Sequence, residues 1–375
     1  MIQIKEVSTK NELKKFVKFP FSLYKDNKYW VPPIISEEVE SFDKQINPVF
    51  DHADARFFLA YKKGQIVGRV AAIINNIEID QQKIRKMRFG WIDFIDDIAV
   101  SRALIEKVHE IGKAANLEFI EGPLGFSNLD KVGVLTHGYD ELSTMVTWYN
   151  YPYYVTHFEK LGFVPSQKFI ETYFYFKDVN IDKYRRYAEI IKKRYALKAI
   201  NFKSSKEVMP YVDEMFDLFN TSYEKLSSFV PVTPKQIEYY KKKFINFINP
   251  EYIKFIVDEN GKLVAFSITM PSFATALQKS KGKLFPTGFI HLLKAKKHSK
   301  TTVFFLIGIL PEYQKKGVTA IVFDEFFKTY QKKGIEKMII TPELEENKDI
   351  QLIWRNFKPI YHKKRCTMRK DILQD

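Results

Sequence analysis

The residues from Pro311 to Ala320 have the types and the order of an anion-binding turn. An apolar run over 303–310 precedes them and an amphipathic pattern follows, so we expect a buried strand, a turn and the start of a helix. The first N–H groups of a helix have no partners within it, and the helix dipole favours negative charge. Glycine in the turn lets a phosphate approach the backbone, and lysines add positive charge. The expected phosphate site comprises Gln314, Lys315, Lys316, Gly317, Val318, Thr319 and Ala320.

Other catalytic chemistries lack their residue patterns. The seven histidines form no HExxH or other recognisable metal spacing, so no metal is expected. Cys366 is the single cysteine, which excludes every CxxC site. Ser127 stands in GFSNL and fails the G-x-S-x-G nucleophile pattern at its last position. The sequence also contains no Walker loop and no dinucleotide fingerprint.

The elements that must position the turn occur twice along the chain. With a constant offset of 197 residues, Gly64 aligns with Gly261 and Val67 with Val264, each pair in a predicted hairpin. A short strand and a helix precede each hairpin, and a helix leading into a strand follows it. The predicted units are an N-terminal domain over 1–175, a connecting amphipathic helix over 176–195 and a C-terminal domain over 196–375. This order predicts an α/β fold in which each unit has a central mixed sheet flanked by helices.

The turn resembles the acyl-CoA pyrophosphate loop of the GNAT (Gcn5-related N-acetyltransferase) superfamily, whose usual pattern is Q/R-x-x-G-x-G/A. Gln314 and Gly317 match this pattern, whereas Thr319 takes the second small position. Nearly the full length also resembles a set of bacterial tandem GNAT-like proteins, through FPFSLYKDNKYWVPP, GPLGFSNLDKVGVLTHGYD and YNYPYY. The resemblance implies two tandem GNAT-like domains and acyl-CoA, acetyl or longer, as co-substrate.

The resemblance also suggests roles for residues after the loop. In the superfamily an Asn lies near the pantetheine arm, as Asn347 would here, and a Tyr seven residues later often serves as general acid; here that position holds Trp354. Candidate bases stand at the end of the preceding strand and could equally be solvated turn residues: Glu343, Glu345 and Glu346. Candidate proton donors to the leaving thiolate are Tyr153, Tyr154 and Trp354.

The first copy departs from the pattern at the phosphate loop. It has no glycine there, and Asp96 and Asp97 at the helix start would repel a pyrophosphate. Phe158 stands at its general-acid position. We therefore expect this copy to have lost conventional CoA binding. A possible acceptor pocket, which could equally be packed core, comprises Asn128, Trp148, Tyr149, Tyr151, Tyr153 and Tyr154.

Composition narrows the class of protein further. Of 375 residues, 45% are apolar and 33 are Phe, which excludes a disordered chain. Sixty Lys and Arg against 45 Asp and Glu give a net charge of +15, which attracts polyanions but is also typical of a lysine-rich solvated surface. One cysteine, no membrane-spanning apolar run and no secretory signal at the start predict a cytoplasmic protein.

A basic stretch over 286–298 bears on the partner. Phe289, Leu292 and Leu293 fall on one side of the expected helix, and lysines lie around them. Such a helix suits peripheral contact with the inner face of the membrane. An ordinary surface helix that packs on the sheet has the same pattern.

These features together favour an acyl-CoA-dependent N-acyltransferase. The acyl group would pass from the thioester to a primary amine on a small molecule or a lipid. One alternative is a tandem GNAT-like peptide ligase that uses aminoacyl-tRNA; such ligases need no pyrophosphate loop, so nucleic acid is not the expected partner. The other is a non-catalytic binding protein on a decayed acetyltransferase scaffold.

Overall fold

The computed structural model describes residues 1–226, 228–244 and 249–372. Its first half contains β1 (Ile2–Glu6), α1 (Lys10–Leu23), α2 (Ile35–Ser41), β2 (Ala53–Lys62), β3 (Gln65–Asn75), β4 (Lys86–Phe94), α3 (Ile98–Ala114), β5 (Phe119–Gly122), β6 (Val134–His137), α4 (Tyr153–Lys160) and β7 (Val164–Tyr175). Helix α5 (Ile181–Tyr195) follows, within the range predicted for the connecting helix.

The second half repeats much of this order. It contains β8 (Lys198–Asn201), α6 (Ser205–Val208), α7 (Val212–Tyr223), α8 (Pro234–Phe244), β9 (Ile253–Val257), β10 (Leu263–Pro271), α9 (Ala274–Ser280), α10 (Gly288–His298), β11 (Thr301–Ile309), α11 (Thr319–Lys333), β12 (Lys337–Leu344), α12 (Lys348–Trp354) and β13 (Ile360–Asp371). No helix in the described ranges is both long and apolar enough to span a bilayer.

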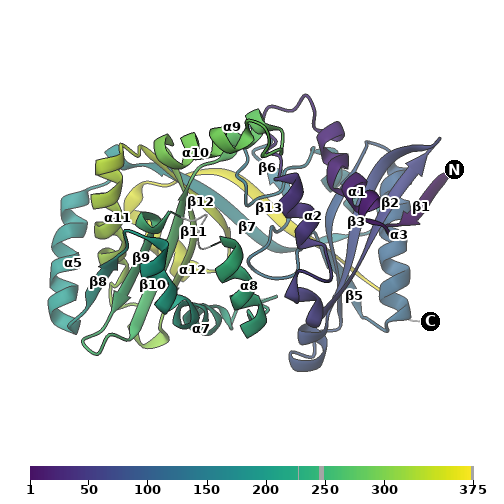
Figure 1. The fold of residues 1–375 in the computed structure, drawn as a ribbon. Helices are drawn as coiled ribbons and strands as arrows, with labels where there is room; N and C mark the ends of the chain where they lie inside the picture. Colours follow the sequence, from purple (N-terminus) through teal and green to yellow (C-terminus); the bar gives the residue numbers. More distant parts are fainter. Residues whose placement is uncertain (227, 245–248, 373–375) are drawn as a thin grey trace.

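One mixed sheet runs through both halves of the described chain. Its strand order is β1-β2-β3-β4-β5-β13-β7-β12-β11-β10-β9-β8, and β6 pairs with β13 off this path. In Figure 1 the first half lies on the right and the second on the left, with β7 and β13 between them. Helix α3 covers the sheet of the first half, and α11, backed by α5, covers the sheet of the second.

The last strand of each half pairs with the other half. Strand β13 lies between β5 and β7, with Met368 opposite Gly122, and β7 pairs antiparallel with β12, with Ile170 opposite Glu343. The predicted domains, 1–175 and 196–375, each contribute their final strand to the shared centre of the sheet. Neither half closes its sheet alone.

A buried ion pair fixes this exchange. Arg365 on β13 donates from Nε to Glu171 Oε1 on β7 at 2.6 Å, and both side chains are fully buried. Burial raises the pKa of Glu171, but the charges of Arg365 and Lys363 and the hydrogen bond from Arg365 together outweigh burial, so the net pKa is lowered. Arg365 Nη1 also donates to the Gly133 and Trp148 carbonyls, which draws the loops around β6 onto β13.

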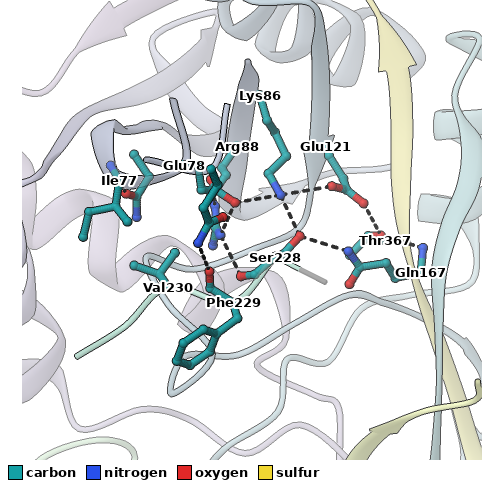
Figure 2. A network of polar contacts seen from close by, with 12 residues as sticks. Ile77, Glu78, Lys86, Arg88, Glu121, Gln167, Ser228, Phe229, Val230 and Thr367 are labelled. Carbon is teal, nitrogen blue, oxygen red and sulfur yellow. Dashed lines mark hydrogen bonds and ion pairs between the residues drawn. The ribbon is translucent and has the colours of Figure 1, made fainter. Parts of the chain in front are cut away.

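A second buried network joins the halves through the loop between α7 and α8 (Figure 2). Lys86 Nζ lies 2.9 Å from Glu78 Oε1 and donates to Ser228 Oγ at 2.6 Å. Arg88 makes two bonds to Glu78 and one to the Ser228 carbonyl at 3.1 Å. Gln167 Nε2 donates to the same Ser228 hydroxyl at 2.9 Å. Three side chains of the first half therefore donate hydrogen bonds to Ser228.

Replacing Glu171 with Ala tests the central ion pair. The change leaves the Arg365 charge buried without its partner, which costs about 3–5 kcal/mol in the free energy of unfolding. Urea denaturation of wild type and variant measures the difference. The control is Glu336→Ala, which removes an exposed ion pair with Lys300 and should cost at most about 1 kcal/mol. Equal losses in the two variants would contradict this role for Glu171.

Candidate functional site

Strands β11 and β12 separate halfway along their length. They pair in parallel only from Thr301 opposite Lys337 to Phe304 opposite Ile340. Beyond that point β11 follows β10 as far as Ile309, whereas β12 follows β7 as far as Leu344. We call the diverging segments, 305–309 and 341–344, the fork.

A β-bulge marks the point of divergence on β11. Its register with β10 shifts where Ile268 pairs with Leu306 and Thr269 with Phe304, so Phe305 is the additional residue. A bulge bends its strand and turns the local backbone out of the ladder. The fork therefore begins at the residue where β11 leaves regular pairing.

The predicted phosphate turn lies at the open end of the fork. Lys315 and Gly317 have positive φ values of 64° and 78°, which turn the chain into α11. No described residue accepts a hydrogen bond from the backbone N–H of Gly317, Val318 or Thr319. Three free donors at a helix start form the geometry that binds a phosphate.

The side chains of the turn leave its backbone open. Gln314 Nε2 donates back to the Ile309 carbonyl at 3.2 Å. Lys315 Nζ is exposed and lies 3.8 Å from Asp349 Oδ2, while Lys316 Nζ lies 4.9 Å from the centre of the Tyr313 ring. Both lysines remain beside the turn, and neither side chain caps its N–H groups.

Glu343 lies on the β12 side of the fork. Trp354 donates from Nε1 to Glu343 Oε1 at 2.6 Å. Burial raises the pKa of Glu343 to about 8, although the bond from Trp354 lowers it in part. A carboxyl with this pKa can exchange a proton near neutral pH, which a general acid or base requires.

Tyr223 faces the fork from the β11 side, at the last residue of α7. Its hydroxyl donates to the Ile307 carbonyl at 3.1 Å, and Ser222 Oγ donates to the Ile309 carbonyl at 3.3 Å. Burial raises the pKa of Tyr223 to about 12, and the nearby Glu343 charge acts in the same direction. Tyr223 could not be predicted as a site residue from the sequence, because it stands in a helical segment without a motif.

Of the predicted proton donors, Trp354 lies beside Glu343, whereas Tyr153 and Tyr154 lie away from the fork. The Trp354 side chain is buried and its one N–H is bonded to Glu343, so this residue positions the carboxyl. Tyr153 donates to the Phe94 carbonyl at 2.6 Å, and Tyr154 bonds to Tyr24 at 2.8 Å. Both tyrosines pack on β4, four strands from β12, or roughly 19 Å at 4.8 Å per strand. The structure places neither tyrosine at the fork, and the donor roles stay predictions.

The residues after β12 form a turn and a helix cap. The Glu345 backbone N–H donates to the Lys168 carbonyl at 2.9 Å, and the Glu346 side chain is exposed. Asn347 Oδ1 accepts from the Ile350 N–H at 3.3 Å and caps α12. The pantetheine contact expected of Asn347 stays a prediction for its side-chain NH₂ group.

The proposed acceptor cluster is largely packed core. Asn128 Oδ1 accepts from the Val230 N–H at 3.1 Å, and Tyr151 donates to the Leu23 carbonyl at 3.4 Å. Trp148 lines a cavity of about 20 Å³, together with Tyr149, Lys131 and the Arg69–Asp93 ion pair. That volume holds about one water molecule, so an acceptor would require these side chains to move.

The first half closes both places that the second half leaves open. The Leu124 N–H donates to the Phe89 carbonyl at 2.8 Å, just beyond the last β4–β5 pair. A Cβ on Gly122 would lie 2.1 Å from that carbonyl oxygen, so only glycine permits this approach. At the start of α3, Asp97 accepts from the Ala99 N–H at 3.0 Å and pairs with Lys62 at 2.6 Å. The loss of CoA binding in the first copy stays a prediction.

Comparison with known proteins identifies the fold. No family model matches the chain. It is 28% identical to Protein YghO of Escherichia coli (strain K12) over 316 residues, which cover 84% of this chain and 80% of that protein. It is 25% identical to the bacterial ceramide synthase of Caulobacter vibrioides (strain NA1000 / CB15N) over 315 residues, covering 82% and 80%.

A solved tandem GNAT protein from the clavulanic acid biosynthesis pathway superposes over 100% of both chains with a TM-score of 0.60 at 8% identity. The chain therefore has the tandem GNAT fold, which confirms the predicted fold class. Among the described residues, no three His, Cys, Asp or Glu side chains are grouped to hold a metal ion.

The variant Glu343→Gln tests the raised pKa of Glu343 through protein stability, a measurement that needs no substrate. The folded-state pKa of about 8 exceeds the ordinary 4.5, so folding favours the protonated form. This contribution to stability is complete below about pH 4.5 and is lost as the pH rises through about 8. Gln keeps an acceptor for Trp354 and does not ionise.

We therefore expect Glu343→Gln to unfold at higher urea concentration than wild type at pH 9 and to match it at pH 4.5. Urea denaturation across this pH range measures the difference. Glu345→Gln, two residues along the same turn, should follow wild type throughout. If Glu343→Gln shows the pH dependence of wild type, the carboxyl is not the group that titrates.

Proposed function

We propose that this chain transfers an acyl group from an acyl-CoA thioester to the primary amine of a long-chain amino lipid. The observation that carries the proposal is the combination, at one fork, of free N–H groups at the start of α11 and the Glu343 carboxyl. The first supports binding of the coenzyme pyrophosphate, and the second supports proton transfer.

The turn at Gly317 suits a pyrophosphate in charge and in shape. Three backbone N–H groups at the start of α11 have no acceptor among the described residues, and the exposed Lys315 lies beside them. Acyl-CoA would supply an activated acyl group on its thioester sulfur. The pantetheine arm would follow the fork, because β11 and β12 no longer pair there.

Glu343 is suited to accept the proton of the attacking amine. A protonated amine cannot attack, and the pKa of about 8 leaves part of the carboxyl ionised at neutral pH. Tyr223 holds its proton at that pH and faces the same fork. In the reaction the amine nitrogen bonds to the acyl carbon as the carbon–sulfur bond breaks. Glu343 takes the proton from nitrogen, and Tyr223 gives one to the departing sulfur.

The acceptor class rests on the relatives. A ceramide is the amide of a fatty acid with a long-chain amino alcohol, and one relative is named as a bacterial ceramide synthase. Its 25% identity extends over 82% of this chain, so the likeness is not limited to the coenzyme half. An amide-forming reaction on a lipid amine therefore suits both halves.

Coenzyme binding is tested by charge at two matched glycines. Gly317→Glu places a carboxylate beside the free N–H groups and should weaken CoA and palmitoyl-CoA binding at least about tenfold, through repulsion of the pyrophosphate. Gly261→Glu makes the same change at a similar φ of 83° in the β9–β10 turn, so it carries the same backbone strain. Calorimetric titration should show binding to wild type and Gly261→Glu alone. Equal loss in both variants, or no binding to wild type, contradicts the proposed coenzyme site.

Amide formation is tested with palmitoyl-CoA and a long-chain amino alcohol, the product being measured by mass spectrometry. Glu343→Gln should lower the rate about 10²–10⁴-fold, the usual contribution of a general base. Tyr223→Phe should lower it while coenzyme binding is kept. Tyr187→Phe, on the exposed surface of α5, is the control and should match wild type. Tight coenzyme binding without product from any amine would instead identify a binding protein.

A further inference from the structure

Helix α10 turns its larger apolar side chains away from the protein. Phe289, Ile290 and Leu293 are 42%, 41% and 60% exposed, and Phe285 just before the helix is 82% exposed. Leu292 is buried at 6% and packs with Phe273 and Leu277. The sequence analysis grouped Leu292 with Phe289 and Leu293, and the structure separates them. Packing on α9 and β10 therefore explains Leu292 but not the outer face.

The exposed side chains form one patch. They occur within two turns of chain, and the Phe285 and Phe289 ring centres lie 6.1 Å apart. Single exposed apolar residues are common on protein surfaces, but a contiguous group of large ones marks an interaction site. We call Phe285, Phe289, Ile290 and Leu293 the α10 patch.

The segment that carries the α10 patch is positively charged. The segment 274–300 contains no Asp or Glu. In the described structure its exposed lysines other than Lys300 have no acidic partner within salt-bridge distance; Lys300 pairs with Glu336. The exposed lysines closest in sequence to the patch are Lys281, Lys283, Lys294 and Lys297.

The hairpin that carries the patch is fixed to the first half. The Ile35 N–H donates to the Gly282 carbonyl at 2.9 Å, and Gln278 Nε2 donates to the Lys28 and Trp30 carbonyls at 2.8 and 2.9 Å. Figure 1 shows α9 and α10 together at the top edge of the molecule, where β11 begins. The patch is therefore held in place on the folded protein.

We propose that the α10 patch and its lysines dock on the surface of an anionic lipid bilayer. Apolar side chains enter the boundary between headgroups and acyl chains, and the lysines contact lipid phosphates. The absence of acidic residues in the segment supplies the charge complementarity. Because α11 begins at the far end of β11 from α10, docking leaves the Gly317 turn facing water. This binding activity is additional to acyl transfer and does not depend on it.

Sedimentation with lipid vesicles tests the proposal on the full chain. Vesicles of equal phosphatidylglycerol and phosphatidylcholine should carry down wild type, and vesicles of phosphatidylcholine alone should carry down at least tenfold less. The triple variant Phe285→Ser, Phe289→Ser, Leu293→Ser should lose binding to the anionic vesicles at least tenfold. The matched control, Tyr187→Ser, Ile190→Ser, Tyr361→Ser, changes equally exposed residues elsewhere and should bind as wild type.

A second variant separates charge from apolar contact. Lys281→Gln, Lys283→Gln, Lys294→Gln, Lys297→Gln should weaken anionic binding and reduce its dependence on salt. Urea denaturation confirms that each variant keeps the fold of the wild type. Undiminished vesicle binding by the patch variant would overturn the proposal. So would no binding by wild type, or a patch-dependent dimer in solution instead, which would indicate a second copy of the chain.

Discussion

The position of β13 between β5 and β7 is the constraint on which the rest of the structure depends. It makes the last residues of the chain a central strand, so the sheet is complete only when both halves are folded. Burying Arg365 between the two halves is tolerable because Glu171 and three backbone carbonyls accept hydrogen bonds from its guanidinium. The pairing of β7 with β12 in turn fixes the side of the fork that carries Glu343.

The two halves differ at the places that correspond to the proposed coenzyme site. In the second half no described residue accepts from the first backbone N–H groups of α11, because the turn contains a glycine and none of its side chains caps the helix. In the first half the Asp97 carboxylate accepts from the Ala99 N–H at the equivalent helix start. The Leu124 N–H, just after β5, donates to the Phe89 carbonyl on β4. Both closures use the protein's own groups in the places where a coenzyme phosphate and its arm would otherwise bind.

Local patterns predicted the strand, the glycine turn and the helix at 303–333, because each depends on residues close together in sequence. The phosphate site in this turn and the role of Glu343 stay predictions. The strand exchange could not be predicted, because the pattern of apolar and polar residues in β13 and β7 is the same whichever half of the sheet they join. Tyr223 was missed for a similar reason: α7 brings it to the fork only through packing. Trp354 was correctly placed after the loop, but its bond to Glu343 makes it a positioning residue. The orientation of α10 could not be predicted either, because its lysines and apolar residues alternate on neighbouring faces of the helix.

The closed first half still contributes to the fork through the loop that follows α7. Its Lys86, Arg88 and Gln167 hold Ser228, and Asn128 holds Val230. Charged groups at this depth are costly unless each is paired, and here Glu78 and Glu121 pair the cations while Ser228 takes further donors. Ser228 lies five residues after Tyr223, so this network limits where the end of α7 can lie over Ile307. The first half, in which the equivalent fork is closed, therefore helps to position the fork of the second half.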